Sequence, residues 1–217
     1  MSRSKGVRHL SLSFPRRRES SPGSSTTLKG CSAEAFRDDG NKKLTRNSKI
    51  SRVSVLGSGK VREGDPVYQQ AVKLGKALGQ EGFTVFHGGF RGVMEAVARG
   101  SREVKGCNVG VTIRGASKKE HALVDAEIKM PCWQSRLFKL IEKGDAYVFL
   151  DGATGTLTEL FVAIEMTNRG LLKKPIIILG KKLTLFLRML KKDPHFDLPR
   201  TLHFTASIPQ AMKLLKR

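Results

Sequence analysis

The stretch Ala146-Tyr-Val-Phe-Leu-Asp-Gly-Ala-Thr-Gly-Thr-Leu-Thr-Glu159 joins three local patterns. Its first five residues are apolar throughout, as in a strand that is buried on both faces of a parallel sheet. A loop with two glycines follows, and a helical pattern runs from Thr156 to Asn168. The order strand, glycine loop, helix is typical of proteins built around a parallel sheet.

The same order of patterns recurs along residues 50–217. The expected strands are 52–56, 83–86, 109–113, a segment within 122–130, 146–150, 175–179 and 201–205. The expected helices are 66 to about 81, 94 to about 100, 134–143, 156–168, 183–191 and 209–216. These repeated units predict the α/β class, as a Rossmann-like, doubly wound, mainly parallel sheet with helices on both faces in three layers.

Charge is the most unusual feature of the composition. The 217 residues contain 40 Lys and Arg against 19 Asp and Glu, a formal net charge of +21. Such an excess often indicates nucleic acid or an anionic membrane as partner. No apolar run approaches the roughly 20 residues that a membrane-spanning helix needs, so we exclude a membrane protein.

Residues 1–49 differ in composition from the rest. They hold twelve basic and four acidic residues, so +8 of the net charge lies there and +13 lies on residues 50–217. The segment is rich in Ser, Gly and Arg and has no sustained strand or helix period. We expect a disordered basic extension over 1–49, which a start codon assigned too far upstream would also produce, and one domain over 50–217.

The three cysteines, Cys31, Cys107 and Cys132, are too few and too scattered for a disulfide framework or a metal-binding pair. We expect free thiols, with Cys107 and Cys132 beside core elements, in a reducing compartment such as the cytoplasm. The histidines show no metal-ligand spacing. We therefore expect neither a metal nor a bound cofactor.

Three expected strands end in glycine-rich loops, at 57–59, 88–92 and 152–156. Glycine lets backbone N–H groups turn towards an anion, and the positive end of the next helix adds attraction. Such loops share the carboxyl edge of a parallel sheet, where ligands bind. The candidate phosphate- or nucleotide-binding residues are Gly57, Ser58, Gly88, Gly89, Gly92, Met94, Gly152, Thr154, Gly155 and Thr156. The spacing matches neither the P-loop nor G-x-G-x-x-G, which argues against an ATPase and an ordinary NAD enzyme.

Two further side chains each allow two interpretations. Glu159 lies in the first helical turn after the last loop, where it could face a bound sugar or only favour the helix N-terminus electrostatically. Trp133 could stack on a purine, or it could be a core or interface aromatic.

These segments together resemble the LOG family of Rossmann-like proteins, long labelled lysine decarboxylases. The resemblance covers about residues 50–217 and is strongest at Gly88-Gly89…Gly92-Val93-Met94 and at Arg136…Asp145-Ala146-Tyr147…Gly152-Ala-Thr-Gly155-Thr156…Glu159. No lysine stands out as a cofactor lysine, so the old label does not suit this chain.

The resemblance implies a phosphoribohydrolase that cleaves the N-glycosidic bond of a nucleoside 5′-monophosphate such as AMP. Free base and ribose 5-phosphate would be the products. It places the catalytic pair at Arg136 and Glu159 and the phosphate-binding pair at Gly155 and Thr156. It also implies a homodimer, for which residues 157–166 are the expected contact.

The chain departs from the family pattern at several positions. Asp151 and Ala153 stand where proline and glycine are usual, Phe90 interrupts a run of glycines, and Leu137 replaces a lysine. Asp151 would place negative charge near the expected phosphate, and the methyl group of Ala153 would disturb the turn if that residue had positive φ.

Two other functions stay open. One is a non-catalytic carrier of a nucleotide or of molybdenum cofactor, as in related carrier proteins. The other is nucleic-acid binding, because DNA-processing proteins share a related core. Nucleic acid is the partner we favour least, since much of the charge lies on residues 1–49.

Overall fold

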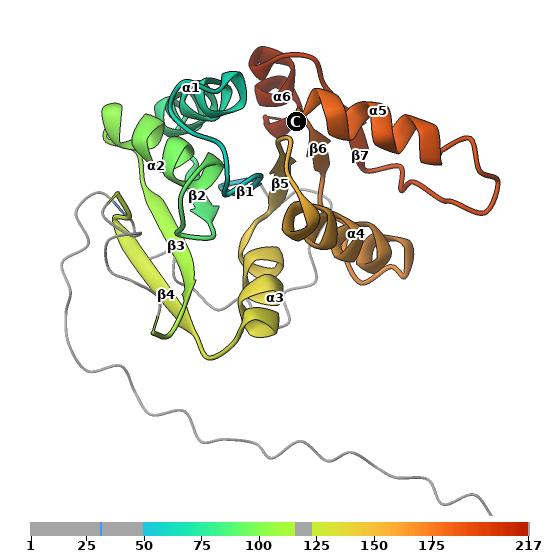
Figure 1. Cartoon of the computed structure of the whole chain (residues 1–217), viewed down its shortest axis with the longest axis horizontal. Helices are drawn as coiled ribbons and strands as arrows, with labels where there is room; N and C mark the ends of the chain where they lie inside the picture. The colour runs from blue at the N-terminus through green and yellow to red at the C-terminus, as the bar shows by residue number, and fades with distance from the viewer. Residues whose placement is uncertain (1–30, 32–49, 116–122, 217) are drawn as a thin grey trace, which may run out of the picture.

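The computed structural model describes residues 31, 50–115 and 123–216, in which strands and helices alternate (Figure 1). The strands are β1 (Arg52–Leu56), β2 (Thr84–His87), β3 (Asn108–Ile113), β4 (Ala126–Met130), β5 (Ala146–Phe149), β6 (Ile176–Ile178) and β7 (Leu202–Phe204). The helices are α1 (Pro66–Gln80), α2 (Val93–Glu103), α3 (Trp133–Lys143), α4 (Thr154–Asn168), α5 (Lys181–Leu190) and α6 (Ile208–Leu215). All expected elements are present, with ends that differ by a few residues.

The described strands form one parallel sheet in the order β4-β3-β2-β1-β5-β6-β7 (Figure 1). The chain winds outward from β1 to β4 and then crosses back to β5, which pairs with the other side of β1. The carboxyl ends of β1 and β5 therefore meet where the winding direction reverses. Such a point opens a crevice for ligands in doubly wound sheets. The predicted Rossmann-like α/β class is confirmed.

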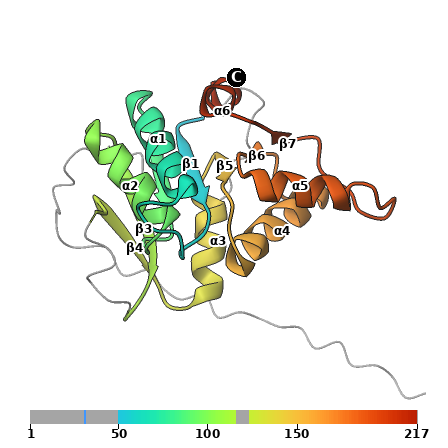
Figure 2. The same ribbon diagram turned by 45° about the horizontal axis from the view of Figure 1, so that its top comes forward.

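Helices cover both faces of the sheet, which gives the three expected layers. On one face α1, α2 and α6 pack through apolar side chains such as Leu74 and Val97. On the other face α3, α4 and α5 pack through side chains such as Leu160 and Leu187. Figure 2 shows α1 and α2 together, with α3 and α4 on the other side of the strands. None of the helices in the described part is both long and apolar enough to cross a membrane.

Asp145 ties β1 to β5 at the amino edge of the sheet. Its Oδ2 accepts hydrogen bonds from the backbone N–H groups of Ser51 and Arg52, at 3.2 and 3.0 Å. Its Oδ1 lies 2.8 Å from Nη2 of Arg52. This part of the family resemblance therefore lies at the opposite edge from the glycine-rich loops and has a structural role.

Lys174 caps the carboxyl end of α3, near the amino edge of the sheet. It is 8% exposed, and its Nζ donates to the carbonyl oxygens of Ile141 and Glu142 at 3.1 and 2.9 Å. We expect Lys174→Met to lower the free energy of unfolding by about 1–3 kcal/mol, because these carbonyls lose a charged donor. Urea denaturation measures the change. Lys173→Met, at an exposed neighbour, is the control, and an equal loss in both variants would contradict this role.

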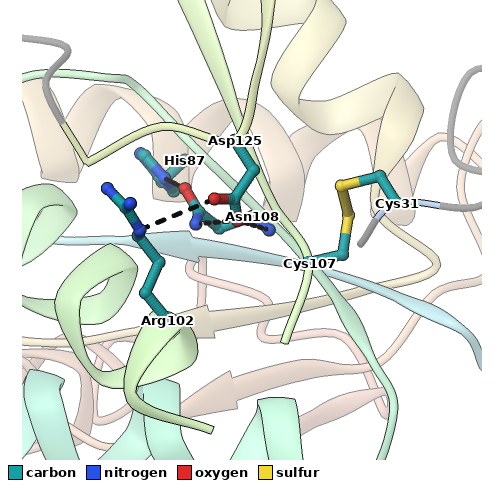
Figure 3. Close-up of a disulfide and its surroundings, with 6 residues drawn as sticks. All are labelled: Cys31, His87, Arg102, Cys107, Asn108 and Asp125. Atoms are coloured by element: carbon teal, nitrogen blue, oxygen red, sulfur yellow. Dashed lines mark hydrogen bonds and ion pairs between the residues drawn. A yellow bond between two sulfur atoms is a disulfide. The ribbon is translucent and has the colours of Figure 1, made fainter. Parts of the chain in front are cut away.

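The prediction of three free thiols is wrong. Cys31 and Cys107 form a disulfide beside the start of β3, although 76 positions separate them (Figure 3). Their distance in sequence gave no signal of the pairing. Cys132 is free, but it is exposed at the N-cap of α3 rather than beside the core. Apart from Cys31, the extension expected over 1–49 lies outside the described residues.

Candidate functional site

A cavity of about 330 Å³ opens at the carboxyl edge of the sheet, between the end of β1 and the amino end of α4. Its wall includes residues from all three glycine-rich loops. The lining residues are 55–60, Gly88, Phe90, Met94, Ile113, Trp133, Arg136, Leu140, 153–156 and Glu159. The cavity therefore occupies the crevice that the reversal of winding creates.

Backbone hydrogen bonds of Ser58 join the three loops. Its N–H donates to the carbonyl oxygen of Asp151 at 3.1 Å, and its own carbonyl accepts from the N–H of Val93 at 2.9 Å. Gly92 has φ 70°, and a Cβ there would lie 2.3 Å from the Ser58 carbonyl oxygen. Only glycine suits both this backbone angle and this close approach.

Arg136 projects from α3 into the cavity and is 6% exposed. Its Nε donates to the carbonyl oxygen of Val111 at 2.9 Å, and its Nη2 lies 3.8 Å from Sδ of Met94. Its guanidinium carbon lies 5.2 Å from the ring centre of Phe90. A Cβ on Gly88 would lie 1.6 Å from Nη2. Gly88 therefore leaves the space that the guanidinium occupies.

Glu159 faces Arg136 from the first turns of α4. It is 9% exposed, and its Oε1 lies 3.6 Å from Nη1 of Arg136. Burial raises the pKa of Glu159 to about 7, and the charge of Arg136 offsets only part of that rise. Burial also lowers the pKa of Arg136, against the opposing effect of Glu159. The carboxyl group can therefore exchange a proton near neutral pH, as a general base must.

The amino end of α4 points at the same cavity. Thr154, Gly155 and Thr156 begin this 15-residue helix and line the wall. The first N–H groups of a helix have no acceptor within it, and Ala153 at the N-cap has no polar side chain to supply one. Nothing lies within 4 Å of the position that a Cβ on Gly155 would take. This end of the helix is suited to bind an anion.

Three predicted binding residues shape the loops without lining the cavity: Gly89, Gly92 and Gly152. Gly89 has φ 69°, and a Cβ on Gly152 would lie 2.1 Å from Oγ1 of Thr156. The other predicted residues all lie in the wall, namely Gly57, Ser58, Gly88, Met94, Thr154, Gly155, Thr156, Arg136 and Glu159.

Asp151 and Ala153, which depart from the family pattern in the last glycine-rich loop, cause no strain there. Oδ1 of Asp151 accepts a hydrogen bond from the N–H of Leu183 at 3.0 Å, so this carboxylate caps the start of α5. Ala153 has φ −104°, an ordinary angle at which a methyl group causes no strain.

We expect Asp151→Ala to lower the free energy of unfolding by about 1 kcal/mol, as the loss of a helix cap does. Binding of nucleotide should change by less than about twofold, because the carboxylate is engaged with α5. Chemical denaturation and calorimetric titration with AMP measure the two quantities. Asp151→Asn keeps an acceptor and is the matched control. A tenfold gain in affinity in both variants would contradict the assignment.

Several lining residues were not predicted. Lys60 follows directly after Gly57-Ser-Gly59, and a cation next to a glycine-rich loop is a signal of anion binding that the sequence does carry. Phe90 stands out in the sequence only as a departure from the family pattern. Trp133 is 44% exposed and lines the cavity, so it is not a core aromatic.

The segment expected to form the dimer contact is buried in part. Within residues 157–166, Leu160, Ala163 and Ile164 are buried in the core of the chain itself. Large exposed apolar side chains lie elsewhere, at Phe138 on α3 and at Leu185 and Met189 on α5. As for metals, no cluster of three or more His, Cys, Asp or Glu suited to hold one occurs in residues 31, 50–115 and 123–216.

Known proteins are similar to this chain in part of its sequence. A model of the SLOG cluster4 family matches residues 50–202. An uncharacterized protein of Archaeoglobus fulgidus is 28% identical over 137 residues, which are 62% of this chain and 87% of that protein. A cytokinin riboside 5′-monophosphate phosphoribohydrolase of Mycobacterium tuberculosis is 33% identical over 112 residues, which are 50% of this chain and 59% of that enzyme.

Solved structures agree with the fold. The X-ray structure of TM1055, a structural genomics target, has a TM-score of 0.65 at 26% identity and covers 76% of this chain and 98% of that one. The molybdenum cofactor binding protein of Rippkaea orientalis has a TM-score of 0.61 at 20% identity, with coverage of 79% and 98%. The family match spans more than half of the sequence, and the resemblance to LOG proteins is confirmed. The chain belongs to the SLOG cluster4 family, a LOG-like group of Rossmann-fold proteins.

Proposed function

We propose that this protein hydrolyses the N-glycosidic bond of a nucleoside 5′-monophosphate, with AMP as the type substrate, to free base and ribose 5-phosphate. The observation that carries the proposal is the buried pair of Arg136 and Glu159 beside the amino end of α4. The names of the curated relatives support the same chemistry, although the match covers 59% of their length.

The 5′-phosphate would bind at the amino end of α4. The N–H groups of Gly155 and Thr156 and the hydroxyl group of Thr154 are the donors we assign to it. Lys60 also lines the cavity and would add positive charge. Phosphate binding at this point would place the ribose next to Glu159, which lies one helical turn further along α4.

Glu159 would act on the sugar. Cleavage of the bond between C1′ and the base nitrogen builds positive charge on the ribose, and an ionised carboxylate stabilises it. The carboxylate also accepts a proton from the water that adds to C1′, while the base leaves with the bonding electrons and gains a proton from solvent. Arg136 would hold Glu159 in its charged form and balance negative charge on the leaving group.

The base would extend towards the apolar part of the wall. Trp133, Phe90 and Ile113 line the cavity there, and aromatic faces suit stacking with a purine. We also propose that the working form is a homodimer, which sedimentation of the full chain at micromolar concentration would test.

Chromatography of an AMP reaction tests the proposal. The full chain at pH 8 should release equimolar adenine and ribose 5-phosphate, while adenosine, which lacks the phosphate, should be a poor substrate. Binding of AMP without turnover would favour a carrier instead. Failure to cleave or bind any nucleoside monophosphate, together with salt-sensitive binding of single-stranded DNA, would favour a nucleic-acid protein.

A further inference from the structure

A row of polar side chains, formed by Asp125, Asn108 and His87, links the residue before β4 to the end of β2 (Figure 3). Asn108 begins β3 and is fully buried, and His87 ends β2 and is 1% exposed. Oδ2 of Asp125 accepts hydrogen bonds from both the backbone N–H and Nδ2 of Asn108. Oδ1 of Asn108 lies 3.2 Å from Nε2 of His87. These side chains do not line the cavity, so the proposed reaction leaves their polar groups unexplained.

The hydrogen bonds in this row of side chains fix the tautomer of the His87 imidazole. The N–H of Gly89 donates to Nδ1 of His87 at 3.1 Å, so Nδ1 carries no proton. The proton therefore lies on Nε2 and is donated to Oδ1 of Asn108. Asp125 accepts from the amide nitrogen, which orients the Asn108 side chain with its oxygen towards His87. These three hydrogen bonds are mutually consistent with a neutral imidazole in one defined tautomer.

His87, at one end of this row of side chains, contacts the Gly88-Gly89 segment, which confines Arg136. Gly89 has φ 69°, and its Cα lies 3.4 Å from the position that a Cβ on Gly110 would take. Its neighbour Gly88 leaves the narrow space that holds Nη2 of Arg136. A shift of the Gly88-Gly89 backbone would therefore change the position of the guanidinium.

We propose that His87 is a positioning residue: as the Nε2–H tautomer held by Asn108, it fixes the Gly88-Gly89 backbone and thereby the guanidinium of Arg136. The importance of that position for hydrolysis rests on the proposed function. The positioning itself is a property of the free protein and can be measured without substrate.

Two substitutions separate the two contacts of the imidazole. His87→Asn places an oxygen near the position of Nδ1, so it keeps an acceptor for Gly89 but loses the contact with Asn108. His87→Gln places its amide near the position of Nε2, so it keeps a donor for Asn108 but loses the contact with Gly89. Both variants replace the ring with an uncharged amide, which makes each the control for the other in stability.

Nuclear magnetic resonance of the full chain gives the readout that is independent of activity. Nitrogen-15 shifts should show the Nε2–H tautomer of His87. The Nε–H of Arg136 donates a hydrogen bond to the carbonyl oxygen of Val111. Its hydrogen should exchange with solvent at least tenfold faster in His87→Gln than in His87→Asn. Thermal unfolding should occur at similar temperatures in the two variants. An Nδ1–H tautomer, or equal exchange in both variants, would overturn the proposal.

AMP hydrolysis gives the second readout. We expect His87→Gln to lower kcat/KM at least tenfold, and His87→Asn to stay within about threefold of the wild type. Equal activity of the two variants would overturn the proposal. If the wild type itself does not cleave AMP, the proposed function has failed, while the exchange of the Arg136 Nε–H still decides whether His87 positions the guanidinium.

Discussion

Replacing Glu159 with glutamine is expected to lower kcat for AMP hydrolysis by about a thousandfold and to leave the dissociation constant of AMP within about threefold. Glutamine has nearly the same shape but cannot carry the negative charge that the cationic sugar needs. The phosphate would still bind at the amino end of α4, which the substitution does not touch. Rapid-mixing kinetics and calorimetric titration measure the two constants.

Glu165→Gln is the matched control. Glu165 lies on the same helix but is exposed and paired with Arg169, so its loss should leave kcat unchanged. If Glu159→Gln retained more than about a tenth of the wild-type kcat, the assignment of the carboxylate would be wrong. The same would follow if both glutamine variants lost activity equally.

The pKa of Glu159 adds a dependence on pH to this prediction. Because the ionised form is the active one and this pKa is that of the free protein, wild-type kcat/KM should rise as pH increases through about 7. Stability should change in the opposite direction. The folded-state pKa lies above the unfolded value of 4.5, so the contribution of Glu159 to stability is present below pH 4.5 and is lost as pH rises through about 7.

Denaturation at pH 4 and pH 8 measures this effect. Between these values, the wild type should lose about 3 kcal/mol of unfolding free energy relative to Glu159→Gln. A parallel dependence in the two proteins would show that Glu159 is not the group that titrates.

The second large effect is expected at Gly88. A methyl group in Gly88→Ala would occupy the space of Nη2 of Arg136, with a separation of only 1.6 Å. The guanidinium is the far end of a flexible side chain, so it should move away while the fold is retained. We expect kcat/KM for AMP to fall at least a hundredfold, with a loss of stability of about 1–2 kcal/mol.

Gly64→Ala tests whether any added methyl group has this effect. Nothing lies within 4 Å of the position that a Cβ on Gly64 would take, so this variant should behave as the wild type in both measurements. Activity of Gly88→Ala within threefold of the wild type would mean that the position of Arg136 does not matter for the reaction.

The fold could be predicted from local patterns, because strands buried on both faces are apolar throughout and each is followed by a turn and a helical stripe. Ile176–Ile178 is the clearest case, since all three residues are fully buried in β6. The disulfide could not be predicted, because the approach of Cys31 to Cys107 depends on tertiary contacts and not on spacing. The number of residues between two cysteines does not show whether they pair.

The place of the candidate site could be predicted in part. Loops after parallel strands must meet at one edge, so the glycine-rich loops could be brought together from sequence alone. The roles of single side chains needed coordinates. Asp151 was expected to act near the phosphate, yet its carboxylate caps α5, a helix that begins thirty residues later. The contacts of His87 likewise join β2 to β3 and leave no local pattern.

The most direct test of the account is a crystal structure of Glu159→Gln with AMP bound. We expect the phosphate at the N–H groups of Gly155 and Thr156, the ribose C1′ beside residue 159, and the base against Trp133. Such a complex would place the scissile bond at the proposed carboxylate. AMP bound outside this cavity, or with its phosphate away from the amino end of α4, would contradict the account.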